Sequence, residues 1–234
     1  SKDVVISTWQ SIYKMKKEYF KDFGCVIGDE AHLFKSKSLT NIMTKLVDCK
    51  YRFGLTGTLD GTQTHRLVLE GLFGGVEKVV STKELMDNKT LANLNIECIV
   101  LKHTEENCKI VKDYSYAEEI DDLVLQPNRN NFISRLCSSL QGNTLCLYQL
   151  VEKHGTTLYG LMKDFDRKVF FVHGGTDAKT RNDIRGIVEK EKNAIIIASY
   201  GTFSTGINIR NINNVVFSSP SKSRIRVLQS IGRG

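Results

Sequence analysis

The stretch CVIGDEAH, residues 25–32, decides the fold. Its apolar first half is typical of a short strand buried on both faces of a parallel sheet. Ligands of such sheets bind at the carboxyl ends of the strands, where Asp29 and Glu30 would lie. We expect Asp29 to hold the magnesium ion of a nucleoside triphosphate and Glu30 to position and deprotonate the attacking water. The alternative is that the two acids are solvated residues at an ordinary strand end, or at a helix N-terminus, where negative charge is favourable.

The residues that follow predict a second strand of the same sheet. Apolar residues recur at helical spacing from 39 to 47, and YRFGL at 51–55 reads as a strand. A strand, a helix and a strand in this order indicate a parallel pair with a right-handed crossover. The second strand ends in Thr56-Gly57-Thr58. Hydroxyls around a glycine at a strand end can relay hydrogen bonds, although an ordinary turn has the same composition.

The residues before the CVIGDEAH stretch predict a strand at 4–6 and a helix capped by Ser7 or Thr8. The start of a capped helix after a strand could bind a phosphate, but a simple capped helix is the alternative. Farther along, we expect a helix rich in leucine over 67–72, a short helix capped by Thr82, and a strand over 95–101.

The second half restarts the alternation of helices and strands, which predicts an α/β fold. The expected helices cover 131–140, 154–165 and 178–190, and the expected strands cover 144–147, 169–172, 194–198 and 215–217. The acidic composition from Glu105 to Asp122, with a break at Pro127-Asn128, predicts a connection between two domains. The expected division is therefore 1–104, a connection over 105–127, and 128–234, with a cleft between the two halves.

Two stretches of the second half carry candidate chemistry. SYGTFSTGIN at 199–208 combines hydroxyls, glycines and an amide after a strongly apolar strand, which suits phosphate or sugar contacts. Gln229 and Arg233 lie four residues apart, on one face of an expected helix. An arginine aimed at a transferring phosphate is an arginine finger. A polar loop and a basic helix are the alternatives.

Composition limits the class of protein. The chain has 234 residues, 41% of them hydrophobic without a long apolar run, which argues against a membrane span. The first residues do not have the pattern of a signal peptide, so none is expected, and the chain is expected to be a piece of a longer protein. The net charge of +7 suggests a polyanionic partner. Six cysteines without C-x-x-C spacing predict reduced core residues in a cytosolic compartment: Cys25, Cys49, Cys98, Cys108, Cys137 and Cys146.

Taken together and in order, these stretches resemble the motifs of superfamily 2 helicases. DEAH at 29–32, TGT at 56–58, SYGTFSTGIN at 199–208 and QSIGR at 229–233 resemble motifs two, three, five and six. The TWQS stretch at 8–11 looks like the motif of the first domain that touches the nucleic-acid backbone. The resemblance spans nearly the whole chain and implies two RecA-like domains, both partial.

The resemblance also implies roles for single residues. Asp29 matches the magnesium-binding acid and Glu30 the catalytic base. His32 matches the residue that links the nucleotide state to the neighbouring domain. Thr56 and Thr58 match the pair that couples hydrolysis to unwinding. Nucleotide contacts come from Gln229 and Arg233, the latter as the finger. The positions that contact nucleic acid in the family are matched by six residues: Thr8, Gln10, Ser11, Ser199, Gly206 and Asn208.

By the same resemblance, the parent protein is an ATP-driven, magnesium-dependent motor on branched or single-stranded DNA, with RNA in RNA–DNA hybrids as a further substrate. Ser199 stands where many relatives have threonine and Asn208 where many have aspartate, and both keep hydrogen-bonding capacity. The chain contains no G-x-x-x-x-G-K-[ST] phosphate loop, which we expect to precede Ser1, and the second arginine of motif six is expected after Gly234. This segment alone is therefore expected to be inactive.

Two other classes of function are compatible with these residues. The first is a nucleic-acid-binding or strand-annealing module in which the motor motifs are relics. The second is a metal-dependent hydrolase that uses Asp29, Glu30 and His32, although the other histidines show no matching ligand spacing. Oligomeric state is not encoded in any of these patterns.

Overall fold

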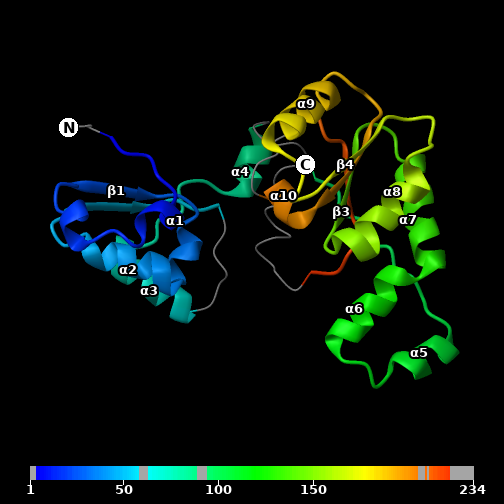
Figure 1. The fold of residues 1–234 in the computed structure, drawn as a ribbon, viewed down its shortest axis with the longest axis horizontal. Helices are drawn as coiled ribbons and strands as arrows, with labels where there is room; N and C mark the ends of the chain where they lie inside the picture. Colours follow the sequence, from blue (N-terminus) through cyan, green and yellow to red (C-terminus); the bar gives the residue numbers. More distant parts are fainter. Residues whose placement is uncertain (1–3, 58–62, 89–93, 205–208, 210, 222–234) are drawn as a thin grey trace. The chain divides into compact units, whose positions relative to one another are not determined.

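The structure is a computed structural model, and it describes residues 4–57, 63–88, 94–204, 209 and 211–221. The chain divides into two compact units, Ser1–Glu97 and Cys98–Gly234. Each unit has its own parallel sheet, of two strands in the first and four in the second (Figure 1). The α/β class predicted from the sequence is therefore confirmed in both units.

The first unit is built on the predicted strand, helix and strand. Strand β1 (Cys25–Gly28) pairs in parallel with β2 (Tyr51–Gly54). Between them come the 3₁₀ turn η2 (Ala31–Lys35) and helix α2 (Lys37–Lys45), and α3 (Gln63–Phe73) follows β2. Buried side chains from the helices, turns and loops form one apolar core: Phe20, Phe34, Leu39, Ile42, Met43, Leu46, Cys49 and Leu69.

The prediction that β1 is buried on both faces is wrong. Side chains alternate between the faces of a strand, and Val26 packs against the core. The opposite face carries Ile27, 64% exposed, and its partner in register, Phe53, 53% exposed. Helices cover one face of this two-stranded sheet, and the described part of the chain leaves the other face exposed.

Four local predictions between residues 4 and 101 also differ from the structure. Residues 4–6 and 95–101 have strand-like sequences but form no strand, because neither segment pairs with another among the described residues. Helix α1 (Trp9–Ile12) begins after Thr8, whose side chain makes no cap hydrogen bond, and the turn η1 (Lys17–Phe20) follows. Helix α4 (Thr82–Asp87) is capped by Ser81 rather than Thr82, since Ser81 and Glu84 form a reciprocal capping box.

The sheet of the second unit has the strand order β4-β5-β3-β6, and every pair is parallel. The strands are β3 (Thr144–Tyr148), β4 (Val169–Val172), β5 (Ile195–Ser199) and β6 (Asn214–Phe217), within one or two residues of the predicted ranges. The central strands β3 and β5 are buried along their whole length. Residues of these two strands point alternately into two cores, one on each face of the sheet.

Helices cover both faces of this sheet (Figure 1). One face packs against α7 (Pro127–Ser139) and α8 (Thr156–Met162), which follows a single π-helical turn, η3 (Val151–Gly155). The other face packs against α9 (Ala178–Val188) and α10 (Tyr200–Ser204). The expected helix over 154–165 is thus a π turn followed by a shorter α-helix.

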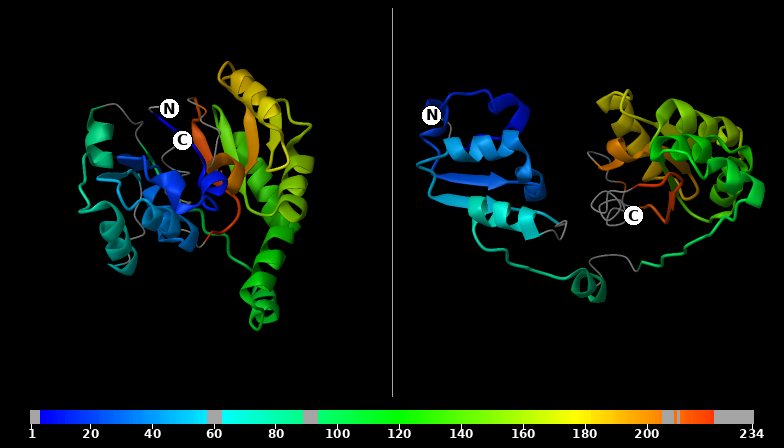
Figure 2. Two further views of the ribbon diagram at one scale, coloured as in Figure 1. Left: turned by 60° about the vertical axis from the view of Figure 1, so that its left-hand side comes forward. Right: turned by 90° about the horizontal axis from the view of Figure 1, so that it is seen from below.

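Residues 105–127, the expected connection between two domains, form helices that cluster with the second unit. These are α5 (Glu105–Val111) and α6 (Tyr116–Leu125), which extend away from the sheet (Figures 1 and 2). Helix α6 contacts η3 and α7. The acidic composition has a structural cause, because Glu105, Glu106, Glu118 and Glu119 occupy first helical turns, where negative charge is favourable.

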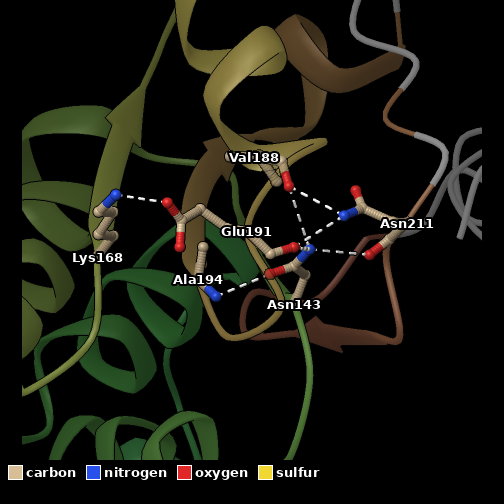
Figure 3. Close-up of polar contacts among 6 residues, drawn as sticks. All are labelled: Asn143, Lys168, Val188, Glu191, Ala194 and Asn211. Carbon is tan, nitrogen blue, oxygen red and sulfur yellow. Dashed lines mark hydrogen bonds and ion pairs between the residues drawn. The ribbon is translucent and has the colours of Figure 1, made fainter.

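A buried asparagine fastens the amino-terminal edge of the second sheet (Figure 3). The side-chain nitrogen of Asn143 donates to the carbonyl oxygens of Val188 at 3.3 Å, Glu191 at 2.8 Å and Asn211 at 3.1 Å. Its oxygen accepts from the backbone N–H of Ala194 at 2.8 Å. One side chain therefore joins the start of β3 to the end of α9, the start of β5 and the segment that leads to β6.

The cysteine prediction holds only in part. All six cysteines are free, as expected for reduced thiols. Cys49, Cys137 and Cys146 lie in the cores, but Cys25, Cys98 and Cys108 are exposed. In the described ranges, every helix is too short or too polar to cross a membrane.

Candidate active site

The first sheet brings two chemically important strand ends together. The backbone N–H of Leu55 donates to the carbonyl of Gly28 at 2.8 Å, and the N–H of Ala31 donates to the carbonyl of Leu55 at 2.8 Å. These bonds continue the parallel pairing past the strands and turn the chain at the carboxyl edge. Asp29 and Thr56 follow the paired glycines at this edge, as the sequence predicts for a ligand site of a parallel sheet.

Glycines at the two strand ends permit close packing under the site. A Cβ atom at Gly28 would lie 2.7 Å from the ring of Phe34. One at Gly54 would lie 2.9 Å from Cβ of Ala31 and 3.0 Å from the ring of Phe73. Any larger side chain would push the η2 turn or α3 away from the sheet, and the acids of the site would move with the turn.

Glu30 has the unusual backbone of the site. Its φ of 49° and ψ of 49° are left-handed, and it is the one non-glycine residue with positive φ in the described part of the chain. This conformation costs about 1–2 kcal/mol for a residue with a Cβ. The backbone N–H of Glu30 donates to Oδ1 of Asp29 at 2.8 Å. Strain of this kind persists where surrounding structure holds a residue in a functional position.

His32 links the acids to the second strand end. It is 7% exposed, and its Nδ1 lies 3.0 Å from Oγ1 of Thr56. The same nitrogen lies 3.3 Å from Oε2 of Glu30, an ion-pair distance when the imidazole is protonated. Three residues that the sequence assigned to one site, Glu30, His32 and Thr56, therefore meet through one imidazole.

A carboxylate at this edge is accessible to water. The side chain of Glu30 is 40% exposed, so its carboxylate can reach water and accept a proton. The described residues contain no group of three or more metal-ligating side chains. Magnesium in nucleotide sites is usually held by one or two carboxylates together with phosphates and water, so the single carboxylate of Asp29 fits that ion.

The predicted nucleic-acid contacts of the first unit lie on its surface. Thr8, Gln10 and Ser11 are all exposed at the start of α1. Oγ1 of Thr8 lies 3.0 Å from Oγ of Ser11. These hydroxyls and the amide of Gln10 can reach a ligand without any change in the core.

Ser199 has a different environment from the exposed hydroxyls. It ends β5 and is buried, with its Oγ 2.7 Å from Oγ1 of Thr202. The backbone N–H of Thr202 donates to the same Oγ at 3.3 Å. Ser199 therefore organises the first turn of α10.

Five predicted site residues lie outside the described residues: Thr58, Gly206, Asn208, Gln229 and Arg233. Conversely, the structure brings together a buried polar group that the sequence analysis missed, formed by Asn130, His154 and Ser219. A histidine and an asparagine inside otherwise apolar helical patterns are the only signal of this group in the sequence.

Two family models match the chain. The helicase conserved C-terminal domain matches residues 128–234, and the type III restriction enzyme, res subunit, matches residues 1–61. The parallel sheets, the acids at the carboxyl edge of the first and the order of the motifs agree with these matches. Residues 128–234 therefore match the helicase conserved C-terminal domain family, and the two matched regions together are those of superfamily 2 helicases.

Individual relatives agree with the family. The chain is 37% identical to the "ATP-dependent DNA helicase uvsW" of Enterobacteria phage T4 over 233 residues, 98% of this chain and 46% of that protein. The crystal structure of T4 UvsW matches with a TM-score of 0.54 and 36% identity, over 96% of this chain and 44% of that one. Dbp5 of S. cerevisiae, bound to RNA and ADP BeF3, shares the fold at a TM-score of 0.57 and 12% identity, over 97% of this chain and 54% of that one. The chain thus spans about half the length of the relatives it matches.

Proposed function

We propose that the full-length protein is an ATP-dependent DNA helicase or translocase that remodels branched DNA. The proposed reactions are fork regression, Holliday junction branch migration and R-loop unwinding, in recombination, repair and replication. The observation that carries the proposal is the left-handed Glu30, held next to Asp29 and joined to Thr56 through His32. The 37% identity to a DNA helicase over 98% of the chain supports it.

In this proposal, Glu30 is the general base of ATP hydrolysis. Its exposed carboxylate orients the attacking water and accepts a proton from it. Asp29 would hold magnesium, and magnesium neutralises charge on the phosphates when it is bound. The bond from the backbone N–H of Glu30 to Oδ1 of Asp29 holds the carboxylate of Asp29 against the turn that carries Glu30.

The remaining site residues couple hydrolysis to movement and contact nucleic acid. The bond between His32 and Thr56 gives a direct path from the base to the end of β2. We assign Thr58 the same coupling role. Gln229 and Arg233 contact the nucleotide, with Arg233 as the finger. The proposed contacts to DNA, or to RNA in hybrids, come from Thr8, Gln10, Ser11, Ser199, Gly206 and Asn208. We further propose helicase domains over 1–104 and 128–234, joined by the helical segment 105–127, and a location in the cytoplasm, of the host cell if the protein is encoded by a phage.

The test is ATP hydrolysis by the full-length protein, with forked, linear and RNA–DNA hybrid substrates. Glu30→Gln removes the base but keeps the size of the side chain, so we expect nucleotide binding to persist while stimulated turnover disappears. Arg233→Ala should lower turnover by roughly 10³-fold, as finger arginines do elsewhere. The control is Glu119→Gln, the same change at an exposed position of α6.

The outcomes separate the competing functions. A preference for forked DNA would support junction remodelling, whereas equal stimulation by linear DNA would limit the function to translocation. Equal turnover in wild type and Glu30→Gln would remove Glu30 from catalysis. Nucleic-acid binding without turnover in any protein would favour the binding or annealing module.

A further inference from the structure

A buried chain of hydrogen bonds crosses the carboxyl edge of the second sheet. It runs from Asn130 on α7 through His154 on η3 to Ser219, which follows β6, and on to Tyr200 at the start of α10. Nε2 of His154 lies 3.2 Å from Oδ1 of Asn130, and Nδ1 lies 2.8 Å from Oγ of Ser219. The hydroxyl of Tyr200 donates to the carbonyl of Ser219 at 2.7 Å. All four residues are buried.

The donors and acceptors of this chain are determined by its ends. The side-chain nitrogen of Asn130 donates to the carbonyl of Val124 at 2.8 Å, so its oxygen faces the imidazole and accepts from Nε2. Nδ1 of His154 is then an acceptor, and the hydroxyl of Ser219 donates to it. Oγ of Ser219 in turn accepts from the backbone N–H of Gln149 at 3.2 Å. Both ring nitrogens therefore have a hydrogen-bond partner when His154 is neutral and carries its proton on Nε2.

Ser219 is the point at which three chain segments meet. Gln149 follows β3, Tyr200 follows β5, and Ser219 itself follows β6. The neighbouring Ser218 strengthens the junction, because its hydroxyl donates to the carbonyl of Leu147 at 2.7 Å. Tyr200 belongs to the stretch 199–208, and Ser219 precedes the stretch 229–233. The start of the stretch 199–208 is therefore bonded to this buried serine.

Burial keeps the imidazole of His154 in the form that this network requires. His154 is fully buried, and burial, with the positive charge of Arg129 nearby, lowers its pKa to about 4. It lies in a π-helical turn, a local distortion that is frequent at functional sites. Neither the hydrolysis site nor the proposed nucleic-acid contacts use His154.

We propose that His154 is a positioning residue for the motor reaction: by holding Ser219, it sets the position of Tyr200 and of the turn 199–204. This proposal rests on the proposed helicase function. The Ser219 arm of the imidazole transmits the position, and the Asn130 arm only attaches the network to α7. If His154 served stability alone, activity would fall with the thermal unfolding midpoint, whichever arm is broken.

Conservative variants separate the two arms. In His154→Asn the amide oxygen can replace Nδ1 as the acceptor from Ser219, whereas in His154→Gln the amide nitrogen can replace Nε2 as the donor to Asn130. Tyr200→Phe keeps the aromatic ring but removes the hydrogen bond from its hydroxyl to the carbonyl of Ser219. Asn130→Ala breaks only the arm to α7.

The experiment measures kcat and KM for DNA-stimulated ATP hydrolysis by the full-length protein, beside hydrogen exchange of the backbone amides of residues 199–204. We expect His154→Gln and Tyr200→Phe to lower kcat by roughly tenfold to a hundredfold with little change in KM, since small displacements of positioned groups have effects of this size. The same two variants should exchange these amides faster. His154→Asn and Asn130→Ala should keep kcat within about twofold of wild type, even where their thermal unfolding midpoint falls.

Equal losses in His154→Asn and His154→Gln, or losses that follow the thermal midpoint across all four variants, would overturn the proposal. If the wild-type protein shows no stimulated turnover, the helicase function itself fails. Hydrogen exchange then still decides whether His154 controls the turn 199–204 through Ser219, because it needs no activity.

Discussion

At Glu30 the backbone and the proposed chemistry make opposite demands. A left-handed φ of 49° favours glycine, whereas activation of water requires a carboxylate. Position 30 has a glutamate in spite of the left-handed backbone, so the strain remains in the folded protein. The Asp29-Glu30 pair and His32 could be predicted from the sequence because acids after an apolar strand have a recognisable pattern. The left-handed backbone could not, since it arises from the turn between β1 and η2.

We therefore expect a trade between stability and activity at this residue. Glu30→Gly should have a free energy of unfolding about 1 kcal/mol higher than Glu30→Ala, because glycine adopts the left-handed conformation without a Cβ clash. Both variants should lack ATP turnover. Chemical denaturation of the two full-length variants measures the difference, and equal stability would mean that the backbone at residue 30 relaxes when the carboxylate is removed.

His154 gives the second unit a pH dependence. Its pKa is lowered to about 4 by burial and by Arg129, while the unfolded chain has the ordinary value near 6.5. Between these two values the unfolded state binds more protons, so stability is lost as the pH falls below about 6.5. At pH 5 we expect a loss of about 2 kcal/mol relative to pH 7.5.

This expectation is tested by urea unfolding at the two pH values, in wild type and in His154→Asn. The variant has no imidazole at this position, so its stability should fall by less over the same interval. An identical pH dependence in both proteins would assign the effect to other groups.

At the level of elements, the η3 turn depends on the absence of a side chain at Gly155. A Cβ atom there would lie 2.5 Å from the ring of Tyr148, which is fully buried and donates to the carbonyl of Val172 at 3.2 Å. The packing of η3 against β3 leaves no room for a methyl group. The sequence predicted a continuous helix here because its apolar spacing does not reveal that close approach.

Gly155→Ala should therefore destabilise the protein by about 1–3 kcal/mol, as overpacking of a core does. Gly160→Ala is the matched control on α8, where a Cβ atom meets nothing within 4 Å. Alanine is the better helix former, so that variant should gain about 0.5–1 kcal/mol. Thermal unfolding of both variants measures the difference, and equal midpoints would show that Tyr148 moves aside at little cost.

At the scale of the whole molecule, residues far apart in the sequence hold the second sheet together. Asn143 joins the end of α9, the start of β5 and Asn211 (Figure 3). Asn143→Asp would direct a carboxylate oxygen at three carbonyl oxygens, so we expect a loss of about 2–4 kcal/mol near neutral pH. The loss should shrink at acid pH, where a protonated carboxyl can donate again. Asn182→Asp, the same change at an exposed position of α9, should stay within about 0.5 kcal/mol of wild type.

Urea unfolding of the two aspartate variants at pH 7.5 and pH 5 tests the role of Asn143. Equal stability of the two variants at pH 7.5 would mean that the network admits water or rearranges around the carboxylate. A loss for Asn143→Asp that does not depend on pH would indicate a change in packing instead of charge.

The sequence alone determined the class of fold, the parallel strands of both units and the order of the helicase motifs. These features depend on local periodicity and on short stretches of residues, which a chain carries wherever it folds. Only the tertiary structure decided that one face of β1 is exposed, that four glutamates of 105–119 lie in first turns of helices, and that His154 meets Ser219. Burial and long-range hydrogen bonds depend on which segments meet in space, and no local pattern specifies that.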